Sequence, residues 1–389
     1  MTAVYYFVRP TDSLFVRGNL AFGDGGEHGA SEMPPPPSLF AGAFRSALLG
    51  KNPALLGAFA QADGATLDAA LGRCLGTPDV TGEFRVSWLS LAVLPGKDAA
   101  MQVFVPLPSD LQRLGENFAP VLPQALPEGV QSAGSLPLRA TLRSAKQEKP
   151  SGGLWLGLPG LRRHLSCEMP VTGEWVEQGS LFRRDPRLGI GLDASSRTAQ
   201  EGQIYTTEGL AFSPAQNGFD GTGFLIGVEG MGGLLPDQGL LRLGGDGRSA
   251  SYSRVDFSPP MAPRPVGSDG RFRLLLQTPA LFKAGWIPDC IQSAASGYLL
   301  QGDGFCARLV CAALGRREVV SGWDLHAWKP KPAQCMVPAG SVYWFDQFRG
   351  DAGKLATWVQ SGLWSDNIDN MQRIRRAEGY NRAWLGAWL

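Results

Sequence analysis

Residues that bind metals or titrate near neutral pH are scarce in this chain. It has 389 residues but only 3 histidines and 6 cysteines, and no two cysteines form a CxxC pair. Structural zinc sites take four such ligands at short, regular spacing, so we expect no metal site, and no motif indicates a cofactor. Cysteines scattered in this way are typical of the reduced thiols of a cytoplasmic protein.

Excess charge and long apolar runs are also missing. The 36 basic and 35 acidic residues give a formal net charge of +1. Bulk charge therefore does not indicate a nucleic-acid-binding protein, and any such function has to depend on local clusters. No run of about 18 uncharged apolar residues predicts a membrane span, and the N-terminus does not resemble a signal peptide. We expect a cytoplasmic protein with no membrane partner.

Glycine and proline are abundant instead. The chain has 51 glycines and 29 prolines, with 44% hydrophobic and 18% charged residues. This composition predicts a globular protein with many turns and long irregular connections. A chain of this length is expected to form two domains, and the mixture of patterns along it indicates the α+β class.

The first fifty residues combine a strand, a glycine loop and a helix. An apolar run at 4–8 predicts the strand, residues 22–29 contain four glycines, and residues 39–49 have apolar positions at helical spacing. Four prolines precede Ser38, which we expect to cap the helix. Loop N–H groups and a helix N-terminus at one place suit an anion such as a phosphate. The alternative is that glycines and prolines simply turn the chain.

Further along, short apolar runs predict strands, which lie at 84–93, 101–106, 203–212 and 224–229. Residues 107–180 differ from these runs, because they contain frequent prolines, a basic bias and no sustained period. We expect a long insertion there, either functional or a solvated loop.

Four arginines surround a Gly-x-Gly in the segment that follows this insertion. They are Arg183, Arg184, Arg187 and Arg197. Arginine is suited to bidentate phosphate contacts and to stacking on bases. The segment therefore predicts an RNA-binding or other phosphate-binding surface, with a chance surface cluster as the alternative.

The turn 244–247, Gly-Gly-Asp-Gly, requires positive φ, and a ligand can approach its backbone closely because no Cβ intervenes. The same turn is equally compatible with a plain hairpin.

The second half of the chain repeats the plan of the first. A proline-dense linker at 257–270 is followed by strand-like and helical runs at 272–278, 307–313, 340–345 and 351–362. This order suits a βαββαβ ferredoxin-like (RRM-like) unit used twice. We predict domains at 1–258, with the insertion at about 107–180, and at 265–389.

Taken together, the motifs resemble the RAMP superfamily of CRISPR proteins, and within it the subunit of type III-B (Cmr) effector complexes that caps the guide RNA. The matching stretches are 17–29, 34–45, 189–205, 244–248, 337–343 and 378–381. The resemblance implies two ferredoxin-like RAMP domains with glycine-rich loops. It also implies binding to the 5′ tag of the crRNA, the large polymerase-like subunit and the adjacent RAMP backbone subunit.

Carried over to this sequence, the resemblance assigns the RNA contacts to loop, helix and strand positions. These are Arg17, Phe22, Gly23, His28, Ser38, Arg45, Arg183, Arg184, Arg187, Arg197, Thr198, Gly244, Gly245 and Arg248. Residues 379–381 depart from the expected residue types, so we expect them to have a packing role.

Three functions stay open on this sequence. The first is a non-catalytic RNA-binding subunit of the type III-B complex, or of a type III-A-like complex. The second is a metal-independent RAMP endoribonuclease that processes guide RNA, with His28 as its general base; no partner acid is identifiable. The third is a purely structural scaffold whose arginines serve protein interfaces.

Overall fold

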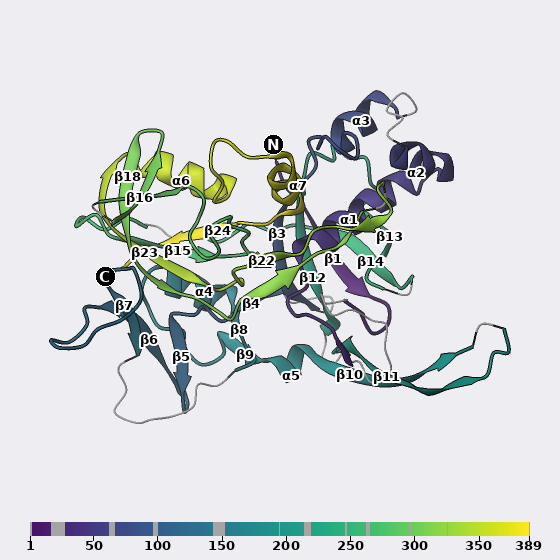
Figure 1. The fold of residues 1–389 in the computed structure, drawn as a ribbon, viewed down its shortest axis with the longest axis horizontal. Coiled ribbons are helices and arrows are strands. Elements are labelled where there is room, and N and C mark those ends of the chain that lie inside the picture. The colour runs from purple at the N-terminus through teal and green to yellow at the C-terminus, as the bar shows by residue number, and fades with distance from the viewer. Residues whose placement is uncertain are drawn as a thin grey trace. The chain divides into compact units, whose positions relative to one another are not determined.

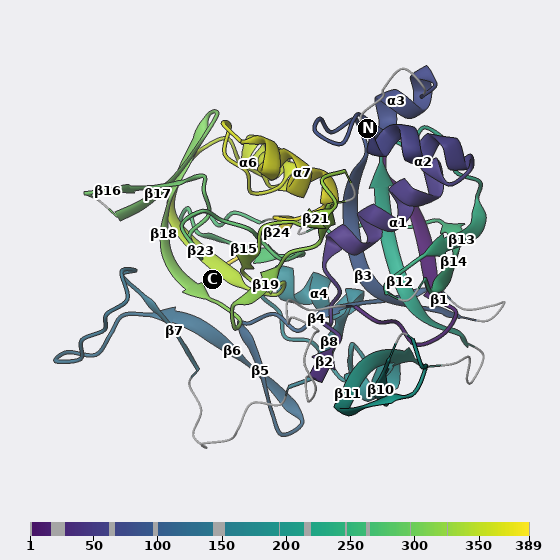
Figure 2. The same cartoon turned by 45° about the vertical axis from the view of Figure 1, so that its right-hand side comes forward.

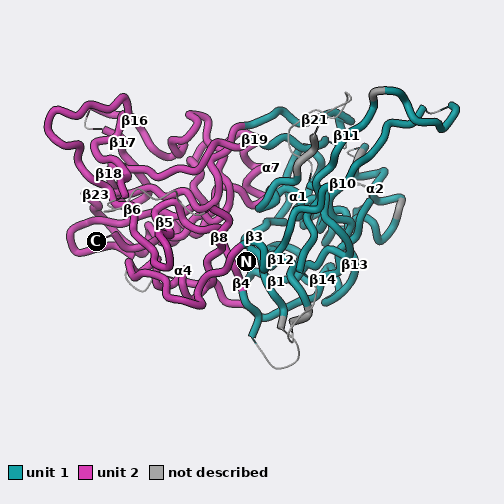
Figure 3. The backbone as a smooth tube through the Cα atoms, turned by 90° about the horizontal axis from the view of Figure 1, so that it is seen from below, with its two compact units in different colours: residues 1–102, 178–256, 319–334 teal, residues 103–177, 257–318, 335–389 magenta. Residues whose placement is uncertain are grey.

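A computed structural model defines the fold (Figures 1 and 2). It describes residues 2–16, 28–61, 67–95, 100–142, 152–193, 195–213, 219–245, 247–261, 265–295, 297–324 and 326–388, with the backbone alone at 28–30, 53, 60, 95, 202, 219 and 220. Two compact units make up the chain (Figure 3). Unit 1 comprises residues 1–102, 178–256 and 319–334, and unit 2 comprises residues 103–177, 257–318 and 335–389.

Unit 1 is built on an antiparallel sheet with the strand order β13-β14-β1-β12-β3. The strands are Val4–Pro10 (β1), Arg85–Pro95 (β3), Phe219–Glu229 (β12), Gln238–Arg242 (β13) and Ser249–Val255 (β14). β1 pairs on both edges, and three consecutive residues, Tyr6, Phe7 and Val8, are buried. Burial of successive residues means that both faces of the sheet are covered here. The strands predicted at 4–8, 84–93 and 224–229 are confirmed.

Three helices precede β3, namely Pro37–Leu49 (α1), Pro53–Ala60 (α2) and Ala69–Leu75 (α3). α1 lies against the sheet (Figure 2). The ring centroid of Phe40 is 4.9 Å from that of Phe224, and the centroid of Phe44 is 5.4 Å from that of Tyr6. Aromatic pairs at these separations anchor the helix on β1 and β12.

The predicted helix is confirmed, but the predicted N-cap is wrong. α1 begins at Pro37, Pro36 holds the N-cap position without a side-chain hydrogen bond, and Ser38 already lies inside the first turn. Proline is accepted at the first helical position because its φ is already helical and the N–H that it lacks has no partner there.

A second sheet of unit 1 has the order β10-β11-β2. Its strands are His28–Ala30 (β2), Phe182–Leu192 (β10) and Ala199–Phe212 (β11), and the short helix α5 (Gln178–Leu181) precedes β10. β2 pairs with β11 only at residues 206–208. The end of the β10–β11 hairpin near residues 192 and 199 therefore extends past the short strand β2 (Figure 1).

A smaller hairpin occupies residues 323–330. It consists of β20 (Trp323–Asp324) and β21 (Lys329–Pro330), which pair antiparallel, and the strands β19 (Glu318–Val320) and β22 (Gln334–Met336) flank it in sequence.

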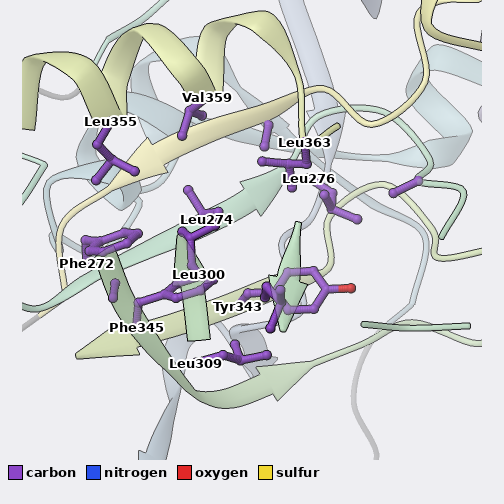
Figure 4. Packing of buried hydrophobic residues seen from close by; sticks show 14 of the residues in the cluster. Phe272, Leu274, Leu276, Leu300, Leu309, Tyr343, Phe345, Leu355, Val359 and Leu363 are labelled. Atoms are coloured by element: carbon purple, nitrogen blue, oxygen red, sulfur yellow. The ribbon is translucent and has the colours of Figure 1, made fainter. Parts of the chain in front are cut away.

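Unit 2 contains a six-stranded sheet with the order β16-β17-β18-β23-β15-β24. The strands are Phe272–Leu276 (β15), Ile291–Ala294 (β16), Gly297–Gly302 (β17), Phe305–Ala313 (β18), Val342–Gly350 (β23) and Ala383–Gly386 (β24). Two helices, Ala352–Ser361 (α6) and Asn370–Glu378 (α7), lie between β23 and β24 in sequence. Leu355 and Val359 of α6 belong to the same buried cluster as the sheet residues Phe272 and Phe345, whose rings stack at 4.9 Å (Figure 4). The predicted strands and the helix at 351–362 are confirmed, whereas α7 was not predicted.

The insertion at 107–180 is not irregular over its described residues. Unit 2 contains here two small three-stranded arrangements, β4-β8-β9 and β5-β6-β7, and the helix α4. Their bounds are Gln102–Pro106 (β4), Leu111–Leu114 (β5), Asn117–Gln124 (β6), Arg139–Leu142 (β7), Leu154–Gly157 (β8), Leu158–Leu165 (α4) and Trp175–Glu177 (β9). The strand predicted at 101–106 is confirmed as β4. The other strands were not predicted, because most of them have three or four residues, which is too short for a recognisable period. That this stretch is an insertion stays a prediction.

The described residues therefore form a mixed α+β fold, as the composition predicts, and the strand pairing is largely antiparallel, with β2 and β11 parallel. The ferredoxin-like form of the two halves and the domain boundaries at 258 and 265 stay predictions. The expected packing role of 379–381 is confirmed, because Tyr380 and Asn381 are fully buried and the Asn381 side chain accepts from the Leu281 amide at 2.7 Å.

A buried polar triad joins three segments of unit 2. Asp110 precedes β5, His164 is in α4 and Arg273 is in β15, and all three side chains are at least nine-tenths buried. His164 Nε2 lies 2.8 Å from Asp110 Oδ1, while Arg273 donates to Asp110 Oδ2 and to the His164 carbonyl. Burial lowers the pKa of His164, and the adjacent Arg273 cation acts in the same direction against the opposing pull of Asp110.

This triad predicts a loss of stability in mild acid. The unfolded chain binds a proton at His164 near pH 6.5, whereas the folded chain resists it. The free energy of unfolding should fall by up to about 1.4 kcal/mol for each pH unit below that value. Chemical denaturation between pH 8 and pH 5 measures the slope. His164→Gln, which keeps an N–H donor without a titrating group, should flatten it; an equal slope in both proteins would contradict the assignment.

Candidate nucleic-acid interface

Strand alternation divides the arginines of β10 between two faces. Arg183, Asp185 and Arg187 share one face, and Arg184 lies on the other. Arg184 donates to the Glu208 carboxylate and, at 3.2 Å, to the Ser31 carbonyl. Its charge is therefore already compensated within the sheet.

The Arg187 side chain reaches the segment that follows β1. Its Nη2 lies 2.8 Å from Asp185 Oδ2 and donates to Ser13 Oγ at 3.0 Å, and its Nε donates to Asp185 Oδ2 at 2.9 Å. Ser13 Oγ donates in turn to Asp185 Oδ2 at 2.6 Å. Asp12 Oδ1 is 3.7 Å from Arg187 Nη2.

Arg248 approaches the same segment from the turn between β13 and β14. Its Nη1 donates to Asp12 Oδ2 at 2.6 Å and to the Ser13 carbonyl at 2.9 Å. Its guanidinium carbon lies 4.6 Å from the ring centroid of Phe15, and that of Arg187 lies 5.8 Å from it. Two arginines thus converge on one aromatic ring, a geometry with a favourable cation–π term.

The glycine turn holds Arg248 in place. Gly244 has φ of +81°, and a Cβ there would lie 2.6 Å from the Phe15 carbonyl oxygen. The Gly245 amide donates to that same oxygen at 2.9 Å. The sequence predicts that a ligand can approach this turn closely; in the structure the Phe15 backbone makes that close approach.

Hydrogen bonds keep both acidic partners of this cluster ionised. The bond from the Ser13 amide, together with the nearby Arg248 and Arg187, lowers the pKa of Asp12. Side-chain hydrogen bonds from Ser13 and Arg187 lower the pKa of Asp185. Because two carboxylates face two guanidinium groups, the cluster carries little net charge at neutral pH.

The cluster nevertheless keeps cationic capacity for a further anion. Arg187 is 42% exposed, and its Nη1 makes no hydrogen bond to the described residues. Arg183 is exposed on the same face and acts on Asp185 only through its charge. A phosphate bound here would contact the outer edge of the Arg187 guanidinium and the whole guanidinium group of Arg183.

The Gly-x-Gly of β10 serves the hairpin rather than a loop. A Cβ on Gly189 would lie 2.4 Å from the Tyr205 ring, and one on Gly191 would lie 2.8 Å from Gln203 Cβ. Both side chains come from the partner strand β11 and lie across the glycines. The opposite face of the hairpin exposes large apolar residues, namely Leu188, Ile190, Leu192 and Ile204.

The remaining predicted residues are either elsewhere in the described part of the chain or outside it. Arg197 and Thr198 are in the turn at the hairpin tip, where Arg197 has φ of +57°; five residues of strand separate this end from Arg187, about 17 Å at about 3.4 Å per residue. Arg45 donates at 3.4 Å to the carbonyl of Leu75, at the end of α3. Arg17, Phe22, Gly23 and the His28 side chain lie outside the described residues.

Three residues of the cluster were not predicted. Asp12, Ser13 and Phe15 follow β1 and supply the acceptors and the ring on which the arginines converge. No spacing in the sequence marks them, because their partners lie about 170 and 235 residues away.

The described residues contain no group of three or more metal-binding side chains. The six cysteines are free thiols. Burial raises the pKa of Cys74 to about 11 and that of Cys311 to about 12, so both thiols stay protonated near neutral pH. No described helix has the length and hydropathy of a membrane span.

An α+β fold with arginines, a glycine turn and an aromatic ring gathered beside antiparallel strands defines a protein suited to binding a polyanionic chain. The family comparison makes this class specific. The chain belongs to the Cmr3 family of CRISPR-associated proteins, whose model matches residues 6–388. This membership confirms the resemblance to Cmr subunits inferred from the motifs.

A solved structure with low sequence identity shares the fold. A chain of the Type III-B Cmr-beta complex bound to cognate target RNA is 15% identical, with a TM-score of 0.50 over 97% of this chain and 96% of that chain. A chain of the same kind of complex bound to cognate target RNA and AMPPnP is 14% identical, with a TM-score of 0.48 over 96% and 92%. Among curated protein sequences no significant match is found.

The close approach at Gly244 predicts unequal effects for two glycine substitutions in one turn. Gly244→Ala places a methyl group against the Phe15 carbonyl and should destabilise unit 1 by about 2–4 kcal/mol. Gly247→Ala is the matched control, since Gly247 also has positive φ but nothing within 4 Å, and should cost only about 1–2 kcal/mol. Urea unfolding measures both; equal losses of stability would show that the approach to Phe15 is unimportant.

Proposed function

We propose that this chain is the non-catalytic RNA-binding subunit of a type III-B CRISPR effector complex and caps the 5′ tag of the crRNA. Family membership supports the assignment to an effector complex. The observation that carries the RNA-binding part is the convergence of Arg187 and Arg248 on Phe15, with Arg183 exposed beside them. We propose a cytoplasmic location for the complex.

In this proposal the tag is held as single-stranded RNA with its phosphates on the arginine face of β10. Arg183 and the outer edge of Arg187 take phosphate oxygens, while Asp185 and Ser13 fix the Arg187 side chain. A guanidinium held in advance loses little conformational entropy on binding. Asp12 and Asp185 limit the attraction for any other polyanion, so affinity depends on geometry more than on bulk charge.

Bases stack on aromatic or guanidinium planes next to these phosphates. Phe22, in the predicted loop, and Tyr205, which lies across Gly189 on the arginine face of the hairpin, are the aromatic candidates. The predicted contacts at Arg17, Gly23, His28, Ser38, Arg45, Arg197, Thr198, Gly244 and Gly245 complete the proposed RNA surface.

We further propose that the protein neighbours are the large polymerase-like subunit and the adjacent RAMP backbone subunit. The apolar face of the β10–β11 hairpin supports a protein interface, because Leu188, Ile190, Leu192 and Ile204 are each at least half exposed on one face. Two ferredoxin-like halves belong to the proposal as well, supported by the strand orders β14-β1-β12-β3 and β24-β15-β23-β18.

Removing the β10 arginines should weaken capture of the guide. The variant Arg183→Ala/Arg184→Ala/Arg187→Ala should bind tag-containing RNA at least tenfold more weakly within the reconstituted complex. The slope of log K against log salt should fall by about 0.7 for each phosphate that the variant no longer neutralises. Filter binding at several salt concentrations measures both quantities.

The matched control removes three arginines elsewhere in unit 1, as Arg73→Ala/Arg242→Ala/Arg254→Ala. It changes the net charge equally and should leave tag binding within about twofold. Undiminished tag retention by the β10 variant would contradict the RNA-binding assignment. Failure of subunit association with intact RNA binding would instead support the scaffold function.

The non-catalytic part of the proposal has its own test. The purified chain, at micromolar concentration in EDTA, should leave repeat RNA intact, because no acid partner for a general base at His28 is identifiable. Denaturing gel electrophoresis reads the result. Cleavage that His28→Ala abolishes would establish the nuclease alternative.

A further inference from the structure

Two tryptophans of unit 1 are exposed to solvent. Trp323 is 51% exposed and Trp328 is 73% exposed, whereas the nine other tryptophans are buried or half-buried. The two rings meet edge to face, with centroids 5.9 Å apart and an angle of 86° between their planes. Edge contact between the indoles leaves ring faces open to solvent.

The hairpin that carries this pair is internally hydrogen-bonded. Asp324 Oδ1 accepts from the His326 amide at 3.0 Å and from the Ala327 amide at 2.9 Å, which fixes the start of the turn. At the open end the Lys331 amide donates to the Gly322 carbonyl at 2.8 Å. Trp328 itself has φ of +49°, an uncommon conformation for an aromatic residue, and it lies directly before β21. Hydrogen bonds thus hold the described residues on either side of the two indoles.

The hairpin carries two lysines and one aspartate. Asp324 uses one carboxylate oxygen on its own turn. Lys329 stands opposite Asp324 in the strand register, is exposed, and has no ion-pair partner among the described residues. Lys331 adds a second positive charge two residues further on. Cations beside open aromatic faces match phosphates beside unstacked bases.

We propose that the 323–331 hairpin is a second RNA-binding surface, on which unpaired bases of single-stranded RNA stack on Trp323 and Trp328 while Lys329 contacts the adjacent phosphate. Stacking needs only a π-face, so this surface binds without sequence preference. We favour RNA over a protein partner because the 323–331 hairpin carries lysines. The apolar face of the β10–β11 hairpin, for which we propose a protein partner, has none. The inference extends the proposed function but does not involve the tag.

The test uses the full chain and a fluorescein-labelled 12-nucleotide oligouridine, which has no tag sequence. Trp328→Leu keeps an apolar side chain without a π-face and should weaken binding by roughly 5- to 150-fold, the range expected when one stacked base loses its aromatic partner. Trp328→Phe keeps the π-face and should stay within about fivefold of the original chain. Lys329→Ala should lower the salt slope by about 0.7. Fluorescence anisotropy measures all four proteins.

Two outcomes would overturn the inference. The first is oligouridine binding that is undetectable in the original chain or unchanged in Trp328→Leu. The second is a Trp328→Leu variant that binds RNA normally but no longer co-purifies with the other subunits of the reconstituted complex, which would make the hairpin a protein-docking surface. The variant Arg183→Ala/Arg184→Ala/Arg187→Ala distinguishes failure of this inference from failure of the proposed function. It should keep oligouridine binding to within about threefold while it no longer holds the tag.

Discussion

The hydrogen-bond network around Ser13 is the interaction on which the candidate site depends. One hydroxyl and one carbonyl of this residue connect the end of β1 to Arg187 of β10 and to Arg248 of the β13–β14 turn. Three elements that are far apart in the sequence are thereby fixed around Phe15. The arginines gain their orientation from these bonds, since long charged side chains are otherwise free to adopt many rotamers. Arginines held in one orientation can form directed hydrogen bonds to a ligand, which freely rotating surface arginines do not offer.

The same network bears on the proposed RNA binding, because the protein has a net charge of only +1. Asp12 and Asp185 cancel much of the field of the two arginines, so distant attraction is weak. At contact distance Arg187 Nη1, which has no hydrogen bond to any described residue, still offers a directed hydrogen bond. A surface of this kind favours an anion whose shape and acceptor positions match the donors.

The sequence predicts those parts of the fold in which the signal is local. The strand at 4–8 and the helix at 39–49 are recognisable because their apolar patterns are sustained, and the glycine turn at 244–247 is recognisable by its composition. Ser38 was misassigned because a proline one residue earlier starts the helix. Phe15, Asp12 and Ser13 could not be found, because only the long-range pairing of β1 brings their partners near. The short strands of 107–177 are too brief to show a period.

The interleaving of the two units affects how the protein is made. Unit 1 takes residues from three separate segments, and β1 completes its pairing only when β14 is available, with Tyr5 opposite Val255. At about 5–20 residues per second, a ribosome needs roughly 12–50 s to synthesise the intervening 250 residues. For most of that time the apolar strand β1 has neither of its two neighbours, because β12 (Phe219–Glu229) is also synthesised late. Expression of this protein thus depends on whatever shields β1 in the nascent chain, and slow translation lengthens its exposure.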